Sequence, residues 1–199
     1  MDVAPPSFKV IGVPRSDGRR GGGLAVIYRD HLSVISASTP SSPTSFETQT
    51  IRLAVSEKHF VIMGINRPPS TNLETFFDEL ADLFDATPSI GGHKIFAGDF
   101  NCPGDSSETV DARISALLSC YNVVAVKSGP THLHSDGGKS MLDLIIESEG
   151  SRRLAPATAT TAGFSDHSLL TTRLQCTNPT VPKVTYTYWN FRHMAATAF

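Results

Sequence analysis

Three short polar segments of the sequence combine residue types that could act as a general base or hold a metal ion, a water or a nucleophile. The first is Gly98-Asp99-Phe100-Asn101, which directly follows the apolar run Ile95-Phe96-Ala97. Alternation along a strand would place Asp99 and Asn101 on one face, about 6–7 Å apart, with Phe100 packed on the other. Polar groups at the exit of a buried strand are costly unless they are satisfied, so they commonly line a site. An Asx-turn that closes the strand fits the same residues, and the sequence leaves both interpretations open.

The second and third segments carry Asp143 and the pair Asp166-His167. Asp143 interrupts an apolar run, where a carboxylate needs a partner, either an arginine or a group of a site. Neighbouring residues of a strand point to opposite faces, so Asp166 cannot easily orient the ring of His167. If His167 is a general base, Asp143 is the natural acceptor for its second ring nitrogen. Asp166 is then free to hold a metal ion, a water or a nucleophile, although a capped turn also explains the Asp-His pair.

Other reactive patterns in the chain are weaker. The pair His132-x-His134 suggests zinc, but no third and fourth ligands accompany it at the usual spacings. The glycine run 21–23 is not followed by Lys-Ser/Thr, which argues against a phosphate-binding loop. No Gly-x-Ser-x-Gly pattern is present, so seryl acyl transfer is disfavoured.

Composition restricts the class of protein. The chain has 199 residues with 40% hydrophobic residues and a formal net charge of −2, which favours one globular domain without a global basic field. A nucleic-acid partner would therefore be held by a local patch or through metal ions. The three cysteines are not spaced like the ligands of a metal site. The sequence shows no signal peptide, and it has no apolar run of the about 20 residues needed to span a membrane. We expect an intracellular monomer, nuclear or cytoplasmic, that has no membrane contact.

Periodicity predicts mostly strands with two inserted helices, which favours an α+β fold of two sheets packed face to face with helices outside. We expect a hairpin of residues 24–28 with 34–37, and a helix capped by Thr71 or Asn72, with Glu74 three residues after Thr71 as in a capping box. We expect the second helix over residues 106–122. The other expected strands are 8–13, 46–55, 60–65, 94–100, 123–126, 141–147, 154–160 and 168–174. The domain is expected to span residues 1–177, and residues 178–199 to form an exit linker.

Taken in order, three segments resemble the last three catalytic motifs of the endonuclease/exonuclease/phosphatase superfamily. They are 98–101 (Gly-Asp-Phe-Asn), 140–143 (Ser-Met-Leu-Asp) and 165–168 (Ser-Asp-His-Ser). Finer features resemble the endonucleases of LINE-type (non-LTR) retrotransposons. These features are the glycine-rich segment 20–26, the Asn-Arg-Pro-Pro-Ser loop 66–70, Pro-Thr-His at 130–132, and Tyr-Trp-Asn-Phe-Arg at 188–192, similar to an exit segment that leads to a reverse transcriptase.

The resemblance implies a DNase I-like four-layer α/β sandwich of two mainly antiparallel sheets, and metal-dependent nicking of DNA. Carried over to this sequence, His167 would be the general base or would contact the scissile phosphate, and Asp143 would orient it. Asp99 and Asn101 would position the nucleophilic water and the phosphate. Asp166 would belong to the same network as a metal ligand. Mg²⁺ suits such ligands, with Mn²⁺ as an alternative.

The resemblance also assigns substrate-binding or supporting positions to Asn66, Thr131 and Ser140, of which Asn66 stands where the family usually has a catalytic Tyr. The family's opening strand, with an active-site Asn, and its acidic motif, whose Glu is the principal metal ligand, have no match here. We therefore expect a chain that lacks the first strand–helix–strand unit. Two alternatives to a nuclease follow: a catalytically dead truncated remnant, and a phosphoesterase or phosphatase from another branch of the superfamily.

Overall fold

The computed structural model describes residues 4–13, 23–87, 91–148 and 153–176. The expected exit linker and the Tyr-Trp-Asn-Phe-Arg segment lie outside these residues, as do positions 20–22 of the glycine-rich segment 20–26. Within the described ranges, no helix is both long and apolar enough to cross a membrane.

A six-stranded mixed sheet forms the centre of the fold, with strand order β3-β4-β5-β6-β10-β7. Its strands are β3 (Ser33–Ala37), β4 (Glu47–Val55), β5 (Lys58–Asn66), β6 (His93–Asp99), β10 (Asp143–Ser148) and β7 (Val123–Ala125). Strands β5 and β6 are parallel, and every other neighbouring pair is antiparallel. The parallel pair requires a crossover, which the first helix supplies.

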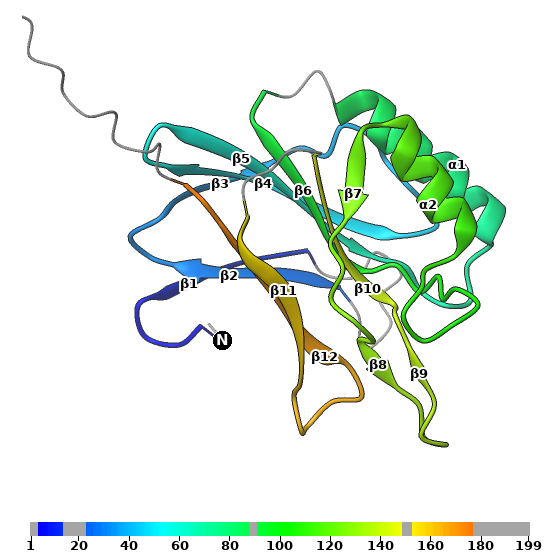
Figure 1. The fold of residues 1–199 in the computed structure, drawn as a ribbon. Helices are drawn as coiled ribbons and strands as arrows, with labels where there is room; N and C mark the ends of the chain where they lie inside the picture. Colours follow the sequence, from blue (N-terminus) through cyan, green and yellow to red (C-terminus); the bar gives the residue numbers. More distant parts are fainter. Residues whose placement is uncertain (1–3, 14–22, 88–90, 149–152, 177–199) are drawn as a thin grey trace, which may run out of the picture.

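Both described helices, α1 (Leu73–Ala86) and α2 (Ala112–Cys120), cover one face of this sheet (Figure 1). Apolar residues of α1 recur at helical spacing, so that Phe76, Leu80, Leu83 and Phe84 all face the sheet and are buried. Phe84 contacts Phe96 of β6 edge to face at 4.7 Å between ring centroids. The buried residues between the helices and the sheet form the larger of two cores, which holds in place the sheet that carries the candidate site.

Strand pairs lie on the opposite face of the sheet (Figure 1). They are β1 (Phe8–Val13) with β2 (Leu24–Arg29), and β11 (Arg153–Thr161) with β12 (Ser168–Leu174). A smaller core of Phe60, Ile95, Val126, Ile145 and Ala157 joins β11–β12 to the sheet. A further short hairpin of β8 (His132–Leu133) and β9 (Lys139–Ser140) projects beside β10. The arrangement confirms the DNase I-like sandwich that the sequence indicated.

Two details of the expected elements are wrong. Residues 34–37 pair with β4, and the partner of β2 is β1, because the loop after β2 carries the chain from one layer to the other. The second helix begins at Ala112 instead of residue 106. The side chain of Asp111 accepts from the Arg113 amide at the N-cap, and Val110 is held in a β-bridge with Pro103, so residues 106–110 form a loop.

The N-cap of α1 is Asn72, one of the two expected residues. Its side chain accepts a hydrogen bond from the Thr75 amide at 3.1 Å. The expected capping box with Glu74 requires Thr71 at the cap, but the Thr71 hydroxyl instead donates to the Pro68 carbonyl. The cap therefore follows the rigid Pro-Pro turn at once and fixes the start of the crossover helix.

Candidate active site

Polar residues from four strands meet at one edge of the central sheet. In the strand register Glu47 pairs with Asn66, Asn66 with Asp99, and Asp99 with Asp143. Neighbouring strands are about 4.8 Å apart, so these residues, distant in sequence, form one continuous row. Two of the strands end at this edge and two begin there.

Asp99 and Asn101 are in direct contact, so the expected separation of 6–7 Å is wrong. The strand ends at Asp99, and Asn101 turns back with a positive φ of 51°. The Asn101 amide N–H donates to Asp99 Oδ1 at 3.0 Å, and Asn101 Nδ2 donates to Oδ2 at 2.9 Å. The Asx-turn that the sequence left as one of two alternatives is therefore present, and it does not exclude a site at the same residues.

A close approach of two strands stands just before this turn. Gly98 has a φ of 142°, and a Cβ built on it would lie 1.9 Å from the carbonyl oxygen of Ile65. Only glycine fits there, since a side chain would push β5 and β6 apart. The Gly-Asp-Phe-Asn segment thus needs its glycine to bring Asp99 beside Asn66.

Arg67 anchors the loop after β5 to the same turn. Its guanidinium is buried and donates to the carbonyls of Asn101 and Thr71, each at 2.9 Å. Its own carbonyl accepts from Asn101 Nδ2 at 2.9 Å, and its amide N–H donates to the Asp99 carbonyl. Arg67 therefore holds Asn101 in place, a role that periodicity and motif spacing alone do not predict.

Asp143 and His167 form the central pair of the site. Asp143 Oδ2 lies 2.8 Å from Nδ1 of His167, as expected for an aspartate that orients a histidine. This contact fixes the proton on Nδ1 and leaves Nε2 of the half-buried ring for chemistry. Burial lowers the pKa of His167, but the bond to Asp143 and the charges of Asp143, Asp99 and Asp166 outweigh it, and the pKa is raised.

Asp99 is the carboxylate with the most perturbed acidity. Burial, together with the negative charge of Asp143, raises its pKa from 3.8 to about 6, although the Asn101 amide opposes the change. Two carboxylates on adjacent strands repel each other when both are ionised. A bound cation would relieve that repulsion.

Thr131 and Ser140, expected as residues that contact the nucleic-acid backbone or support the site, are both buried. Thr131 Oγ1 accepts from the amides of Leu142 and Asp143, at 3.0 and 2.9 Å. Ser140 Oγ is hydrogen-bonded to Nε2 of His134. This is the geometry of supporting residues, because neither hydroxyl faces the solvent.

Asn66 lies at the end of β5 beside Asp99. Its Nδ2 donates to Glu47 Oε2 at 2.7 Å, and Glu47 also accepts from the Gly23 amide at 2.9 Å. The donated bond orients the Asn66 amide. Glu47 is a site-edge residue that sequence reasoning missed, because in the sequence it is an ordinary polar residue at the start of an alternating strand.

His132, which sequence reasoning set aside, belongs to the site. It lies on β8, which forms a bridge to His167, and its ring centroid is 4.7 Å from that of His167. Its Nε2 is 3.4 Å from Oδ2 of the exposed Asp166. The signal that could have found it is its place in Pro-Thr-His ahead of Asp143.

Two groups among the described residues have ligand atoms close enough to share a metal ion. In one, Asp99, Asp143 and His167 contribute atoms that all lie within 4.8 Å of one another. In the other, His132, Asp166 and His167 do the same. The expected metal ligand Asp166 falls in the second group, apart from Asp99 and Asp143.

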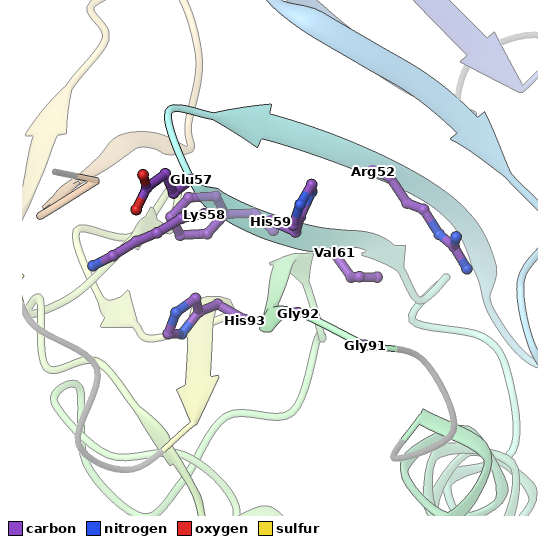
Figure 2. Close-up of a pocket in the computed structure, with 9 residues that line it drawn as sticks. Arg52, Glu57, Lys58, His59, Val61, Gly91, Gly92 and His93 are labelled. Carbon is purple, nitrogen blue, oxygen red and sulfur yellow. The ribbon is translucent and has the colours of Figure 1, made fainter. Parts of the chain in front are cut away.

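A separate cavity of about 520 Å³ lies at the other end of β5 and β6. Figure 2 shows Lys58, His59 and His93 around it, with Arg52 on the neighbouring strand. Because β6 runs from His93 to Asp99, the cavity and the Asp99 turn are about 20 Å apart. The cavity is therefore not part of the candidate active site.

Comparisons with known proteins concern the chain as a whole. A model of the Endonuclease/Exonuclease/phosphatase family matches residues 3–167. A search of curated proteins found no match.

Among solved structures, the endonuclease domain of TRAS1, a telomere-specific non-LTR retrotransposon, is similar with a TM-score of 0.66 at 17% identity. The similarity covers 85% of this chain and 80% of that one. An endonuclease/exonuclease/phosphatase family protein from Leptotrichia buccalis gives 0.62 at 16% identity, over 86% and 72%. The 3′ phosphatase NExo from Neisseria, bound to a product DNA hairpin, gives 0.59 at 13% identity, over 85% and 80%. At these identities the likeness shows the fold.

Proposed function

Since the chain belongs to the Endonuclease/Exonuclease/phosphatase family, we propose that it is a metal-dependent phosphodiesterase that nicks DNA, as the endonuclease domain of a retrotransposon would. The observation that carries the proposal is the constellation of Asp99, Asn101, Asp143 and His167 at one sheet edge. Hydrolysis of a phosphodiester needs an activated water, a neutralised phosphate and a fixed in-line geometry. Each side chain of the constellation suits one of these needs.

His167 is suited to bind the phosphate group of the substrate. Its raised pKa favours the protonated ring, which donates from Nε2 to a phosphoryl oxygen while Asp143 holds Nδ1. Asp99, with a pKa of about 6, is ionised at neutral pH and still basic enough to accept a proton from water. Of the two roles that the resemblance allowed for His167, this acidity favours phosphate contact and makes Asp99 the proton acceptor.

Asn101 completes the constellation from beside Asp99. Arg67 binds its backbone carbonyl and Asp99 binds its side-chain amide, so its conformation is fixed before substrate arrives. Groups that need no rearrangement in the transition state are the most effective. Asn66 and its partner Glu47 extend the polar row and would contact the substrate strand beyond the cleaved bond.

The donor set fits a divalent metal ion. Asp99 and Asp143 are adjacent, partly buried carboxylates, and burial with mutual repulsion accounts for the raised pKa of Asp99. Oxygen donors of this kind suit Mg²⁺, or Mn²⁺, whereas Asp166 groups with His132 and His167 instead. Bound there, such an ion would supply Lewis acidity toward the phosphate.

DNA is the proposed substrate because the similar TRAS1 domain is a retrotransposon endonuclease and the similar NExo is bound to a product DNA hairpin. NExo is a 3′ phosphatase, so removal of a terminal phosphate is the second candidate. A monomer that works beside a reverse transcriptase is part of the proposal.

A nicking assay tests the proposal. Purified chain is incubated with supercoiled plasmid in Mg²⁺ or in EDTA, beside His167→Ala and the control His59→Ala, which alters the distant cavity. We expect Mg²⁺-dependent nicking by the wild type and by His59→Ala, and none by His167→Ala. A 3′-phosphorylated oligonucleotide in parallel separates phosphatase from endonuclease activity. Absence of both activities in a folded chain would refute the proposal and favour a catalytically dead protein.

A further inference from the structure

His132, Asp166 and His167, here called the His132 cluster, bring together two imidazoles and one carboxylate. One ligand atom of each residue lies within 4.8 Å of the others. His132 Nε2 and Asp166 Oδ2 are 3.4 Å apart. Two ligands of a tetrahedral zinc ion, bound at about 2.1 Å, are themselves about 3.4 Å apart. One of the three ligand pairs therefore already has the spacing of a zinc site, and the other two pairs lie within 4.8 Å.

Backbone hydrogen bonds hold the two segments of the cluster together. The Leu133 amide donates to the Asp166 carbonyl at 2.8 Å, and the Ser168 amide donates to the Thr131 carbonyl at 2.7 Å. These bonds place His132 opposite His167 in an antiparallel bridge. A ligand set on paired backbone is preorganised, which reduces the entropy lost on binding.

His167 has the hydrogen bonding of a metal ligand. Its Nδ1 is bonded to Asp143 Oδ2 at 2.8 Å, so Nε2 is the ring nitrogen left to bind an ion. A carboxylate on the far nitrogen is the usual partner of a metal-bound histidine, because it fixes the tautomer and makes the ring more basic. Asp166 is mostly exposed, so an ion can enter from solvent.

We propose that the His132 cluster binds a d-block divalent cation such as Zn²⁺, at a site different from the carboxylate pair Asp99 and Asp143. Imidazole nitrogens select zinc and its neighbours, whereas Mg²⁺ prefers oxygen. Three protein ligands leave a fourth position open to water. Occupancy would take Nε2 of His167 away from a substrate phosphate, so the ion would inhibit hydrolysis. That consequence rests on the proposed function, but the binding does not.

His134 offers a matched control. The sequence pairs it with His132 as a possible zinc motif, and its ring lies 4.6 Å from that of His132. Its Nε2, however, is hydrogen-bonded to Ser140, and it is absent from the metal-capable group. The structure thus assigns the partners of His132 to residues more than thirty positions away.

The test titrates the full chain with Co²⁺ and follows visible absorption, then displaces Co²⁺ with Zn²⁺ and measures Zn²⁺ affinity by calorimetry. We expect one equivalent of Co²⁺ with the spectrum of a four-coordinate ion. Variants His132→Gln and Asp166→Asn should lower Zn²⁺ affinity at least about 100-fold, since losing a ligand costs more than losing its hydrogen-bonded partner. His134→Gln should leave the affinity unchanged.

Circular dichroism checks the fold of each variant, and Asp166→Asn changes an exposed side chain, so it gives an answer even if His132→Gln unfolds. Failure of the wild type to bind one Zn²⁺, or equal affinities of the wild type and a folded Asp166→Asn, would overturn the inference. Zn²⁺ binding without Mg²⁺-dependent nicking would leave the inference standing and refute the proposed function alone.

Discussion

Asp99→Asn should reduce the loss in free energy of unfolding that the chain undergoes between acidic and neutral pH. The Asp99 carboxyl has a pKa of about 6, raised by burial and by Asp143, against an ordinary value of 3.8. Between these two values the folded chain keeps a proton that the unfolded chain releases. The contribution of Asp99 to stability is therefore present below about pH 4 and is lost as pH rises through about 6.

The size of the effect follows from the two pKa values. A pKa of about 6 instead of 3.8 corresponds to about 3 kcal/mol between the protonation states. Asp99 is only partly buried, so solvent screening reduces this to about 1–2 kcal/mol. The variant also loses a hydrogen bond to Asn101, but that loss is independent of pH and cancels when two pH values are compared.

Urea unfolding in EDTA, at about pH 4 and about pH 7.5, measures the effect for wild type and variant. The change in free energy of unfolding between the two pH values should be about 1–2 kcal/mol more favourable in Asp99→Asn. Equal pH dependence would refute the reasoning that burial penalises this charge. Mg²⁺ should restore stability to the wild type at pH 7.5 but not to the variant.

Three further predictions concern neighbours of this carboxylate. Asp143→Asn should lower the pKa of His167, measured by NMR titration of the ring, because its hydrogen-bonded anion is lost; an unchanged pKa would contradict the assigned pair. Thr131→Val should destabilise the fold by about 2 kcal/mol in urea, since two buried amides lose their acceptor, while Thr131→Ser keeps the oxygen and stays close to wild type. Phe164→Ala should leave stability unchanged but weaken the binding of single-stranded DNA, measured by fluorescence anisotropy, by about 1–3 kcal/mol. The reason is that this aromatic residue, two positions before Asp166, is 93% exposed and can stack on a base. Equal DNA affinities of wild type and variant would exclude Phe164 from the interface.

Much of the fold was predictable because long periodic segments have one stable arrangement. The alternating and apolar strands and helix α1 all appear close to their expected limits. The pair Asp143–His167 was also predictable, since an aspartate inside an apolar run needs a partner and Asp166 faces the wrong way. Both inferences depend on local rules that tertiary contacts did not override.

The remaining features depend on pairing between distant segments, which no local pattern records. His132 joins the site only because β8 pairs with residues 166–168, and Glu47 only because β4 lies in register with Asn66. Asn101 departs from strand geometry because its left-handed conformation is held by Arg67 from another loop. The second helix is shortened because Val110 lies opposite Pro103 in a β-bridge, closed by the Gly104 and Asp111 amides, which donate to the Thr109 and Cys102 carbonyls. Each case is a non-local contact that outweighs local propensity.

The contact between Asp143 and His167 joins two layers of the sandwich as well as two residues. Asp143 begins β10 of the central sheet, and His167 directly precedes β12. Strand β12 packs on the sheet through the smaller core, which has five buried residues, whereas the core between the sheet and the helices has seventeen. The β11–β12 hairpin is therefore the part with the least apolar anchoring, and such parts open at lower free energy than the whole. Opening of this hairpin would separate the two halves of the pair while the central sheet stays intact. Local opening of this one hairpin would therefore be enough to inactivate the site. Activity would be lost at a denaturant concentration at which most of the molecule is still folded.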